Sequence, residues 1–219
     1  MRLTTWNGQS GPTLARAALL APLQSDILLL QECARPHSQS PQCLWFGDNP
    51  RKGVAVLARE PWSLHPGPIH SSVSDSAFPV IVDGPESFHL LAIWAKQRPT
   101  YVRALLHALD HYRDFLLAAP SVLAGDFNSH ACFNKGNTIN HATLVQRLQS
   151  EFAVASAWHA LHTHEPPTLY WQWKQDQPFH IDYCFLPQAW LPRLQSATIA
   201  NYEDVAAESD HRPLTITLA

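Results

Sequence analysis

Several stretches of this sequence place a polar side chain of the same few types at or near the end of a predicted strand. These polar residues are Asn7, Glu32, Asp126, Asn128, Asp182, Asp210 and His211. Carboxylate and amide oxygens are hard ligands that suit Mg²⁺ or Mn²⁺, and an imidazole beside them can orient a ligand or stabilise charge. If the strand ends meet at one edge of the fold, the set suits phosphoryl transfer to water.

Each of these residues also has an ordinary structural explanation. An aspartate after a strand is commonly a turn former, so GDFN at 125–128 and SDH at 209–211 can each be plain turns. Glu32 can be a solvated strand end, and Asn7 can cap the following helix. The joint occurrence of these residues, in a chain with only 18 acidic residues, favours a shared site.

Strand patterns account for most of the chain that must position these residues. The apolar run in DILLLQE predicts a strand buried on both faces. Two hairpins are predicted, one around the turn at 47–52 and one around 83–86. We expect strands at 2–7, 26–32, 43–46, 53–59, 77–82, 87–95, 121–126, 168–173, 180–186 and 212–218.

Helical patterns occupy three segments, at 11–24, 100–118 and 140–152. The longest can be capped by Thr100 and carries one apolar stripe. The stripe consists of Val102, Leu105, Leu106, Leu109, Tyr112 and Leu116. In the first helix, Leu14, Ala18 and Ala21 lie on one face, and in the third, Leu144, Val145 and Leu148 point inward. The order of elements predicts two packed sheets with outer helices, in one domain over residues 1–219.

Five motifs, in this order along the chain, resemble the endonuclease/exonuclease/phosphatase superfamily. They are TTWN, LLLQE, LAGDFN, HIDYCFL and ESDHRPL. The superfamily includes pancreatic-type deoxyribonucleases, abasic-site endonucleases, sphingomyelinases and inositol-phosphate phosphatases. The resemblance implies an α/β fold, a four-layer α/β/β/α sandwich of two packed, mainly antiparallel sheets. It also implies a site at one edge of that sandwich, which agrees with the layers expected from the pattern of elements.

The resemblance implies a metal-binding role for three residues. Glu32 resembles the main ligand of Mg²⁺ or Mn²⁺, and Asn7 and Asp210 resemble its neighbours, either directly or through water. It implies catalytic roles for four more. Asp126 would hold or deprotonate the attacking water, and Asn128 would orient that water or a phosphate oxygen. His211 would donate to a non-bridging oxygen, and Asp182 would fix the tautomer of His211.

The sequence departs from the family pattern at several positions. Gln9 stands where nucleases of the family often carry an acidic residue, so the site could favour one metal over two. Trp94 takes the place of a phosphate-contacting His or Tyr, and Lys96 or Gln97 could supply that contact, although Trp94 can equally be core and Lys96 solvated. His180 stands where some relatives place Arg, as a second phosphate donor or a packing residue.

The loop after GDFN is predicted to overhang the site, where Asn134 could touch substrate. Composition gives no broad electrostatic surface for long duplexes, since the net charge is −3. A local positive patch could form from Arg51, Lys52, Lys96, Arg98, Arg103 and Lys135. Eight Trp residues could serve the core or stack on planar ligands.

Four cysteines without a CxxC pair argue against a zinc ribbon and for reduced thiols. The start of the sequence lacks the apolar region of a signal peptide, and no apolar run is long enough to span a membrane. We therefore expect a cytoplasmic monomer with no membrane partner.

The leading hypothesis is a Mg²⁺- or Mn²⁺-dependent phosphoesterase that cleaves phosphodiester bonds in nucleic acid, DNA or RNA. A phosphatase or phosphodiesterase acting on a small-molecule or lipid-headgroup phosphate stays open, because the chain is compact and mildly acidic. A binding module on the same fold is a second alternative, favoured by Gln9 and Trp94. A zinc hydrolase built on His159, His162 and His164 is a third.

Overall fold

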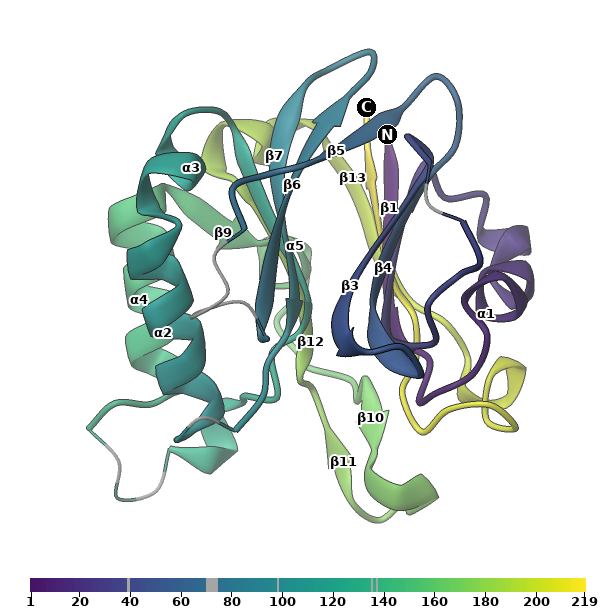
Figure 1. Ribbon diagram of the computed structural model, residues 1–219. Helices are drawn as coiled ribbons and strands as arrows, with labels where there is room; N and C mark the ends of the chain where they lie inside the picture. Colours follow the sequence, from purple (N-terminus) through teal and green to yellow (C-terminus); the bar gives the residue numbers. More distant parts are fainter. Residues whose placement is uncertain (39, 70–74, 98, 135, 137) are drawn as a thin grey trace.

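The computed structural model describes residues 1–38, 40–69, 75–97, 99–134, 136 and 138–219. In these residues two six-stranded sheets pack face to face, and helices cover the outer face of each (Figure 1). This arrangement is the four-layer α/β/β/α sandwich expected from the sequence, so the predicted fold class is confirmed. Each sheet is mixed, with one parallel pair among antiparallel ones.

The first sheet has the strand order β13-β14-β1-β2-β4-β3. Its strands are β1 (Arg2–Asn7), β2 (Ile27–Cys33), β3 (Cys43–Asn49), β4 (Lys52–Ala58), β13 (Leu194–Ile199) and β14 (Leu214–Leu218). Strands β1 and β2 are parallel, and Asn7 pairs with Gln31. Asn7 and Glu32 therefore leave the sheet at the same edge.

The second sheet has the strand order β5-β6-β7-β8-β12-β9. Its strands are β5 (Ser63–Pro66), β6 (Ala77–Asp83), β7 (Phe88–Trp94), β8 (Ser121–Asp126), β9 (Val154–Ser156) and β12 (Asp182–Pro187). In register, Asp126 lies opposite Trp94 on β7 and opposite Asp182 on β12. The pairing therefore brings these three residues to one edge.

Helices cover both outer faces of the sandwich (Figure 1). They are α1 (Thr13–Leu19) on the first sheet, and α2 (Tyr101–His111), α3 (Arg113–Leu117) and α4 (His141–Phe152) on the second. The short helix α5 (Ala157–Leu161) follows β9 and packs Ala157 and Trp158 into the core between the sheets. The 3₁₀ turns are η1 (Ala21–Leu23), η2 (Ala131–Phe133), η3 (Trp171–Trp173), η4 (Gln188–Arg193) and η5 (Tyr202–Asp204). A ribbon of β10 (Leu169–Tyr170) and β11 (Pro178–Phe179) projects from the lower edge in Figure 1.

The continuous apolar strands are explained by three separate layers of core. Along β2, Ile27 and Leu29 pack between the two sheets, whereas Leu28 and Leu30 pack toward α1. Because successive side chains of a strand point to opposite faces, a strand covered on both sides must be apolar throughout. The third cluster lies between the second sheet and its helices, and it contains the predicted inward residues Leu105, Leu109, Tyr112, Leu116, Leu144 and Leu148.

Several sequence expectations need correction. The predicted helix over 100–118 is two helices, since Tyr112 leaves helical geometry between α2 and α3. In the first helix the face of Leu14, Ala18 and Ala21 is exposed, with Leu14 63% exposed, and the opposite face packs on the sheet. The predicted strand at 168–173 stops at Tyr170, because Gln172 and Trp173 have positive φ and turn the chain.

The remaining properties concern the whole chain. All four cysteines are free thiols. Within the described residues, no helix combines the length and apolar character needed to cross a bilayer. Arg98 and Lys135, two members of the predicted basic patch, lie outside the described residues.

Candidate active site

The predicted site residues converge at the edge of the sandwich from which the β10–β11 ribbon projects. Asn7 and Glu32 come from the first sheet, and Asp126 and Asp182 come from the second. Asp210 and His211 precede β14 of the first sheet. The site is therefore assembled across the gap between two sheets.

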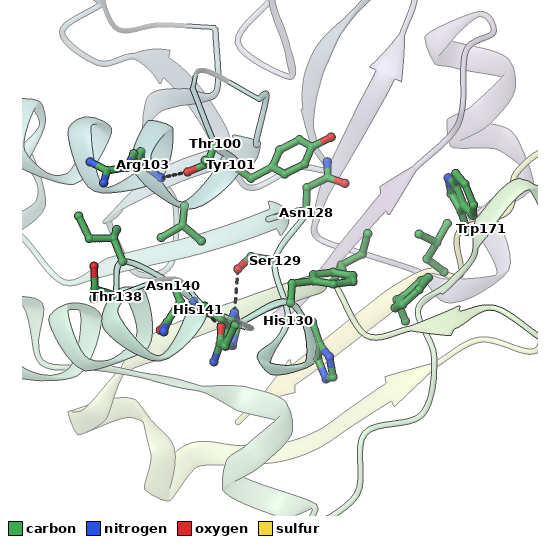
Figure 2. A pocket seen from close by; sticks show the side chains of 18 residues that line it. Thr100, Tyr101, Arg103, Asn128, Ser129, His130, Thr138, Asn140, His141 and Trp171 are labelled. Atoms are coloured by element: carbon green, nitrogen blue, oxygen red, sulfur yellow. Dashed lines mark hydrogen bonds between the residues drawn. The ribbon is translucent and has the colours of Figure 1, made fainter.

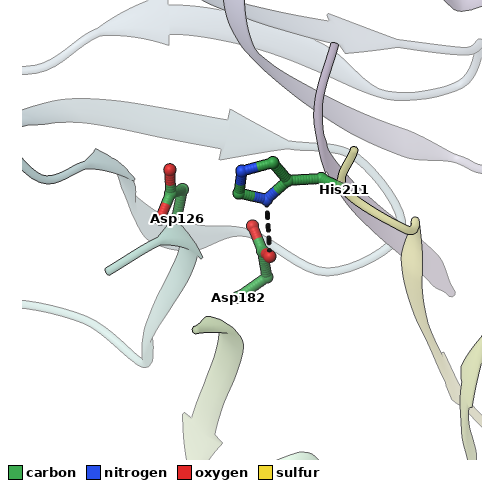
Figure 3. Close-up of side chains that lie close together, drawn as sticks. All are labelled: Asp126, Asp182 and His211. Carbon is green, nitrogen blue, oxygen red and sulfur yellow. Dashed lines mark hydrogen bonds and ion pairs between the residues drawn. The ribbon is translucent and has the colours of Figure 1, made fainter. Parts of the chain in front are cut away.

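Asp126, Asp182 and His211 form the centre of this site (Figure 3). One ligand atom of each lies within 4.8 Å of the others, and all three residues are buried. His211 Nδ1 lies 2.9 Å from Asp182 Oδ2. The imidazole is fixed from the backbone side as well, because Trp6 Nε1 donates to the carbonyl of His211 and the His211 N–H donates to Ser209 Oγ.

The pKa values of two central residues, Asp126 and His211, are both raised. Burial would lower the pKa of His211, but the charge and hydrogen bond of Asp182, with the charges of Asp126 and Asp210, raise it to about 9. Burial, together with the negative charge of Asp182, raises the pKa of Asp126 to about 7. The site therefore presents an imidazolium beside a carboxyl group that can gain or lose its proton near neutral pH.

The Asp126 carboxylate is held by three donors. Oδ2 accepts from the side-chain amides of Asn7 and Asn128, each at 3.0 Å, and Oδ1 accepts from the backbone N–H of Asn128 at 2.9 Å. Asn128 reaches this position because its φ is +46°, in the left-handed region that Asn tolerates. Asn7 was predicted to be a metal ligand; here its amide orients Asp126, while its Oδ1 accepts from the Gln9 N–H.

Glu32 and Asp210, the remaining acidic residues, lie near each other at one end of the site. Glu32 has a φ of +59° and sits where the register of β2 shifts against β4, so its side chain leaves the ladder. Its carboxylate is 2.7 Å from Lys52 Nζ. Asp210 Oδ2 accepts from the Gln172 N–H at 2.9 Å, and burial raises the pKa of Asp210.

The donor set at this end fits a hard divalent cation. Glu32 and Asp210 offer carboxylate oxygens, and the charge of Glu32 contributes to the raised pKa of Asp210. Gln9 Oε1 is buried and has no hydrogen-bond partner among the described residues. A buried carbonyl oxygen left unpaired is costly, and an ion or its water shell would satisfy it. Glu32, Asp210 and Gln9 are thus the residues that could hold Mg²⁺ or Mn²⁺.

Except for Asp182, the acidic residues of the site line one cavity of about 440 Å³ together with His211. Trp94 forms part of its wall, with Lys96 Nζ 4.5 Å and Lys52 Nζ 5.6 Å from the ring centroid. The predicted residues that line it are Asn7, Glu32, Trp94, Lys96, Gln97, Asp126, Asn128, Asp210 and His211. Asp182 lies behind His211, and Thr168 Oγ1 fixes it by accepting the N–H groups of Ile181 and Asp182.

A second cavity of about 530 Å³ adjoins the first (Figure 2). The two share Tyr101, Asn128, Leu169 and Trp171 as lining residues. Asn134 lines this second cavity, where its Oδ1 accepts from the His141 N–H at 3.0 Å. The aromatic rings of Phe133 and Trp171 are 47% and 48% exposed there.

His180 is not brought to either cavity. It is buried, its Nδ1 lies 2.8 Å from the carbonyl oxygen of Pro166, and burial lowers its pKa. The reason is local: β11 ends at Phe179 and β12 begins at Asp182, so strand alternation does not relate His180 to Asp182. The structure therefore supports a packing position for His180 rather than a phosphate contact.

The three histidines of the zinc hypothesis point to different partners. His159 Nε2 lies 2.8 Å from Glu165, and His162 Nε2 lies 3.0 Å from the carbonyl oxygen of Ala197 while its ring stacks on Trp158. In the described part of the chain, the three side chains of metal-binding type that lie close enough to share an ion are Asp126, Asp182 and His211.

Sequence reasoning missed several residues at this edge. Lys52 was assigned only to a basic patch, and its pairing with Glu32 depends on the irregular end of β2. Thr168 and Ser209 are ordinary strand-flanking residues in the sequence, yet they hold Asp182 and His211. Tyr101 and Trp171 carried no local signal beyond their aromatic type.

Known proteins resemble this chain in sequence and in fold. The sequence matches the model of the Endonuclease/Exonuclease/phosphatase family over residues 4–211. No curated protein matches it. Among solved structures, it resembles a variant of the 3′ phosphatase NExo from Neisseria bound to a product DNA hairpin, with a TM-score of 0.75 and 21% identity over 100% of this chain and 99% of that one.

Two further structures are similar. The 3′-5′ exonuclease NExo from Neisseria meningitidis has a TM-score of 0.73 and 21% identity, covering 100% of this chain and 99% of that one. The endonuclease domain of TRAS1, a telomere-specific non-LTR retrotransposon, has a TM-score of 0.72 and 16% identity, covering 99% and 97%. At these identities the likeness establishes the shared fold.

Proposed function

The chain belongs to the endonuclease/exonuclease/phosphatase family, and we propose that it is a divalent-metal-dependent phosphoesterase that hydrolyses phosphodiester bonds in nucleic acid. The observation that carries the proposal is the buried group of Asp126, Asp182 and His211, of which Asp126 and His211 line the cavity. It combines a carboxyl group that titrates near neutrality with an imidazolium, which is the pair that acid–base hydrolysis requires.

Asp126 is the group that takes the proton of the attacking water. Three hydrogen bonds from Asn7 and Asn128 fix both of its oxygens, so the carboxylate is oriented before the substrate arrives. A base with a pKa near 7 is deprotonated in much of the protein at neutral pH and still accepts a proton readily. Attack in line with the leaving oxygen would invert the configuration at phosphorus.

His211 stabilises the charge that develops on the phosphate. Asp182 engages Nδ1, so Nε2 is the ring nitrogen available to donate to a non-bridging oxygen. A divalent ion held by Glu32, Asp210 and Gln9 would supply charge neutralisation of the phosphate and of the leaving oxygen. We assign Mg²⁺ or Mn²⁺ because the donors are oxygens.

Nucleic acid is the proposed substrate for two reasons. Similar folds include a 3′ phosphatase bound to a product DNA hairpin and a retrotransposon endonuclease domain. In this chain, the second cavity opens beside the catalytic one and exposes the rings of Phe133 and Trp171, on which a base can stack. We also propose that residues 1–219 form one domain and that it works in the cytoplasm, where free thiols such as these persist.

An assay on defined substrates tests the proposal. The purified protein is incubated with Mg²⁺, Mn²⁺ or EDTA and with single-stranded, abasic-duplex and 3′-phosphorylated oligonucleotides, or with p-nitrophenyl esters. We expect metal-dependent release from the oligonucleotides. We expect Asp126→Ala to lower kcat by about 10²- to 10⁴-fold, whereas Asp114→Ala, an exposed aspartate on α3, leaves it unchanged.

The alternatives give different results in the same assay. Hydrolysis of the p-nitrophenyl esters alone would replace the nucleic-acid substrate with a small phosphate ester. Absence of hydrolysis, with no Mg²⁺ or Mn²⁺ binding by calorimetry, would favour a binding module on this fold.

A further inference from the structure

Lys52 lies in the catalytic cavity but has no place in the mechanism above. It is the first residue of β4, and its Nζ is 2.7 Å from Glu32 Oε2. The contact arises because Glu32 sits at the register shift of β2 against β4, which turns its carboxylate toward the start of β4. The proposed main metal ligand is therefore already paired with a cation of the protein itself.

Lys52 is also placed for a second partner. Its ammonium lies over the Trp94 ring, at 5.6 Å from the centroid, on a wall that leads to Asp126 and His211. The Lys52 side chain is 41% exposed, whereas that of Glu32 is 16% exposed. Since lysine carries its charge on a flexible four-carbon stem, small rotations can move the ammonium from Glu32 into the cavity.

A divalent ion and the ammonium of Lys52 cannot share the Glu32 carboxylate without repulsion. Two cations at neighbouring positions disfavour each other, and both seek the same oxygen atoms. Gln9 sharpens this competition, because a neutral amide stands where a carboxylate would add negative charge to the set.

We propose that Lys52 is a phosphate-binding residue that is held by Glu32 in the metal-free protein and is released toward the substrate when a divalent ion takes Glu32. The inference rests on the proposed metal-dependent phosphoesterase and adds a residue to its substrate contacts. Lys52 then couples metal binding to substrate binding, because its ammonium becomes available to the substrate phosphate only once the ion is bound to Glu32.

Two measurements test this role, because Lys52→Gln should strengthen Mn²⁺ binding and weaken substrate binding. For Lys52→Gln, Mn²⁺ affinity, measured by electron paramagnetic resonance without substrate, should rise about fivefold, as expected from the loss of one partly exposed ion pair. The KM for an oligonucleotide substrate should rise by about the same factor, with a smaller change in kcat. Lys52→Arg, which keeps the charge, should restore Mn²⁺ affinity toward that of the wild type.

Arg51→Gln is the matched control, since it removes an exposed positive charge one residue away. It should leave Mn²⁺ affinity within about twofold of wild type. Equal Mn²⁺ affinity in wild type and Lys52→Gln would overturn the coupling alone and leave the proposed function standing. A wild type that binds no Mn²⁺ would overturn both. If Lys52→Gln does not fold, Lys52→Met, which keeps the unbranched stem, gives the same comparison.

Discussion

At the scale of single residues, the candidate site brings two buried acidic side chains together beside one imidazole. Asp182 and Asp126 face each other across β8 and β12, and both are buried. His211 lies between them and pairs with Asp182. Burial and the neighbouring charge of Asp182 raise the pKa of Asp126 to about 7, although the charge of His211 opposes the rise.

The pKa values of Asp126 and His211 predict a bell-shaped dependence of kcat/KM on pH. With Asp126 as the proposed base, activity should rise as pH passes its pKa of about 7, and a bound divalent ion should move this limb to lower pH. With His211 as the proposed acid, activity should fall as pH passes its pKa of about 9. Initial rates between pH 5 and 10 on one oligonucleotide measure both limbs. A descending limb below pH 7 would show that His211 is not held as the imidazolium.

Asp182→Asn separates the charge of Asp182 from its shape. An asparagine can still accept from His211, and its NH₂ group can replace Asp182 Oδ1, which has no hydrogen-bond partner among the described residues. We expect a folded protein with kcat lowered by about 10²-fold or more and a descending limb at lower pH, because the charge that raises the pKa of His211 is gone. An unchanged descending limb would contradict the assignment.

The sequence predicted the central residues because strand ends and motif order carry that information. Asp126, Asn128 and His211 each follow or precede a strand that the apolar pattern identifies. The packing position of His180 and the pairing of Lys52 with Glu32 could not be read from the sequence, for the same kind of reason. Their positions depend on backbone irregularities, the break between β11 and β12 and the register shift of β2, which no periodic pattern reveals.

At the scale of elements, interior strands were easier to predict than edges. Strands β2 and β8 lie inside their sheets and are buried on both faces, so their apolar runs are plain. Strands β5, β9 and β13 were missed, and each lies at the edge of a sheet. Edge strands are short and partly polar, because they pair on one side only. The face of α1 was misjudged because its seven residues are mostly Ala and Leu on all sides.

Gly125 gives the sharpest prediction for an element. It precedes Asp126 in β8, has a φ of +142°, and pairs with Ile93 of β7, whose carbonyl oxygen would lie 1.9 Å from an added Cβ. Gly125→Ala must push the two central strands apart, so we expect a loss of more than about 3 kcal/mol in the free energy of unfolding and a Tm lower by roughly 6–12 °C. Thermal unfolding by circular dichroism measures it.

The control for this substitution is Gly136→Ala. Gly136 also has a positive φ, +72°, but an added Cβ meets no atom of the described residues within 4 Å. Only the cost of backbone strain, about 1 kcal/mol, is expected there. Equal losses from the two substitutions would mean that φ, and not the contact with β7, sets the cost at Gly125.

At the scale of the whole molecule, the active site is also a connection between the two sheets. Asn7 of the first sheet donates to Asp126 of the second, and His211 beside β14 pairs with Asp182 of β12. The facing surfaces of the sheets meet through apolar packing, which has no directional preference. A few polar contacts at other margins also join them, such as the Leu64 N–H donating to the Pro41 carbonyl beside β3. The polar contacts at the site therefore help to fix how one sheet sits on the other, and the site and the sandwich depend on each other.

This mutual dependence predicts that a divalent ion stabilises the fold as a whole. An ion that binds only the folded protein adds about 2.7 kcal/mol to the free energy of unfolding at a concentration of 100 Kd, which corresponds to roughly 5–10 °C in Tm for a chain of this size. Calorimetric scans with increasing Mg²⁺ or Mn²⁺ should show that rise. Glu32→Gln should fold normally, because Lys52 is the ion-pair partner of Glu32 within the described residues, and it should lose most of the rise. A full rise in Glu32→Gln would place the ion elsewhere, with the group of Asp126, Asp182 and His211 as the next position to test.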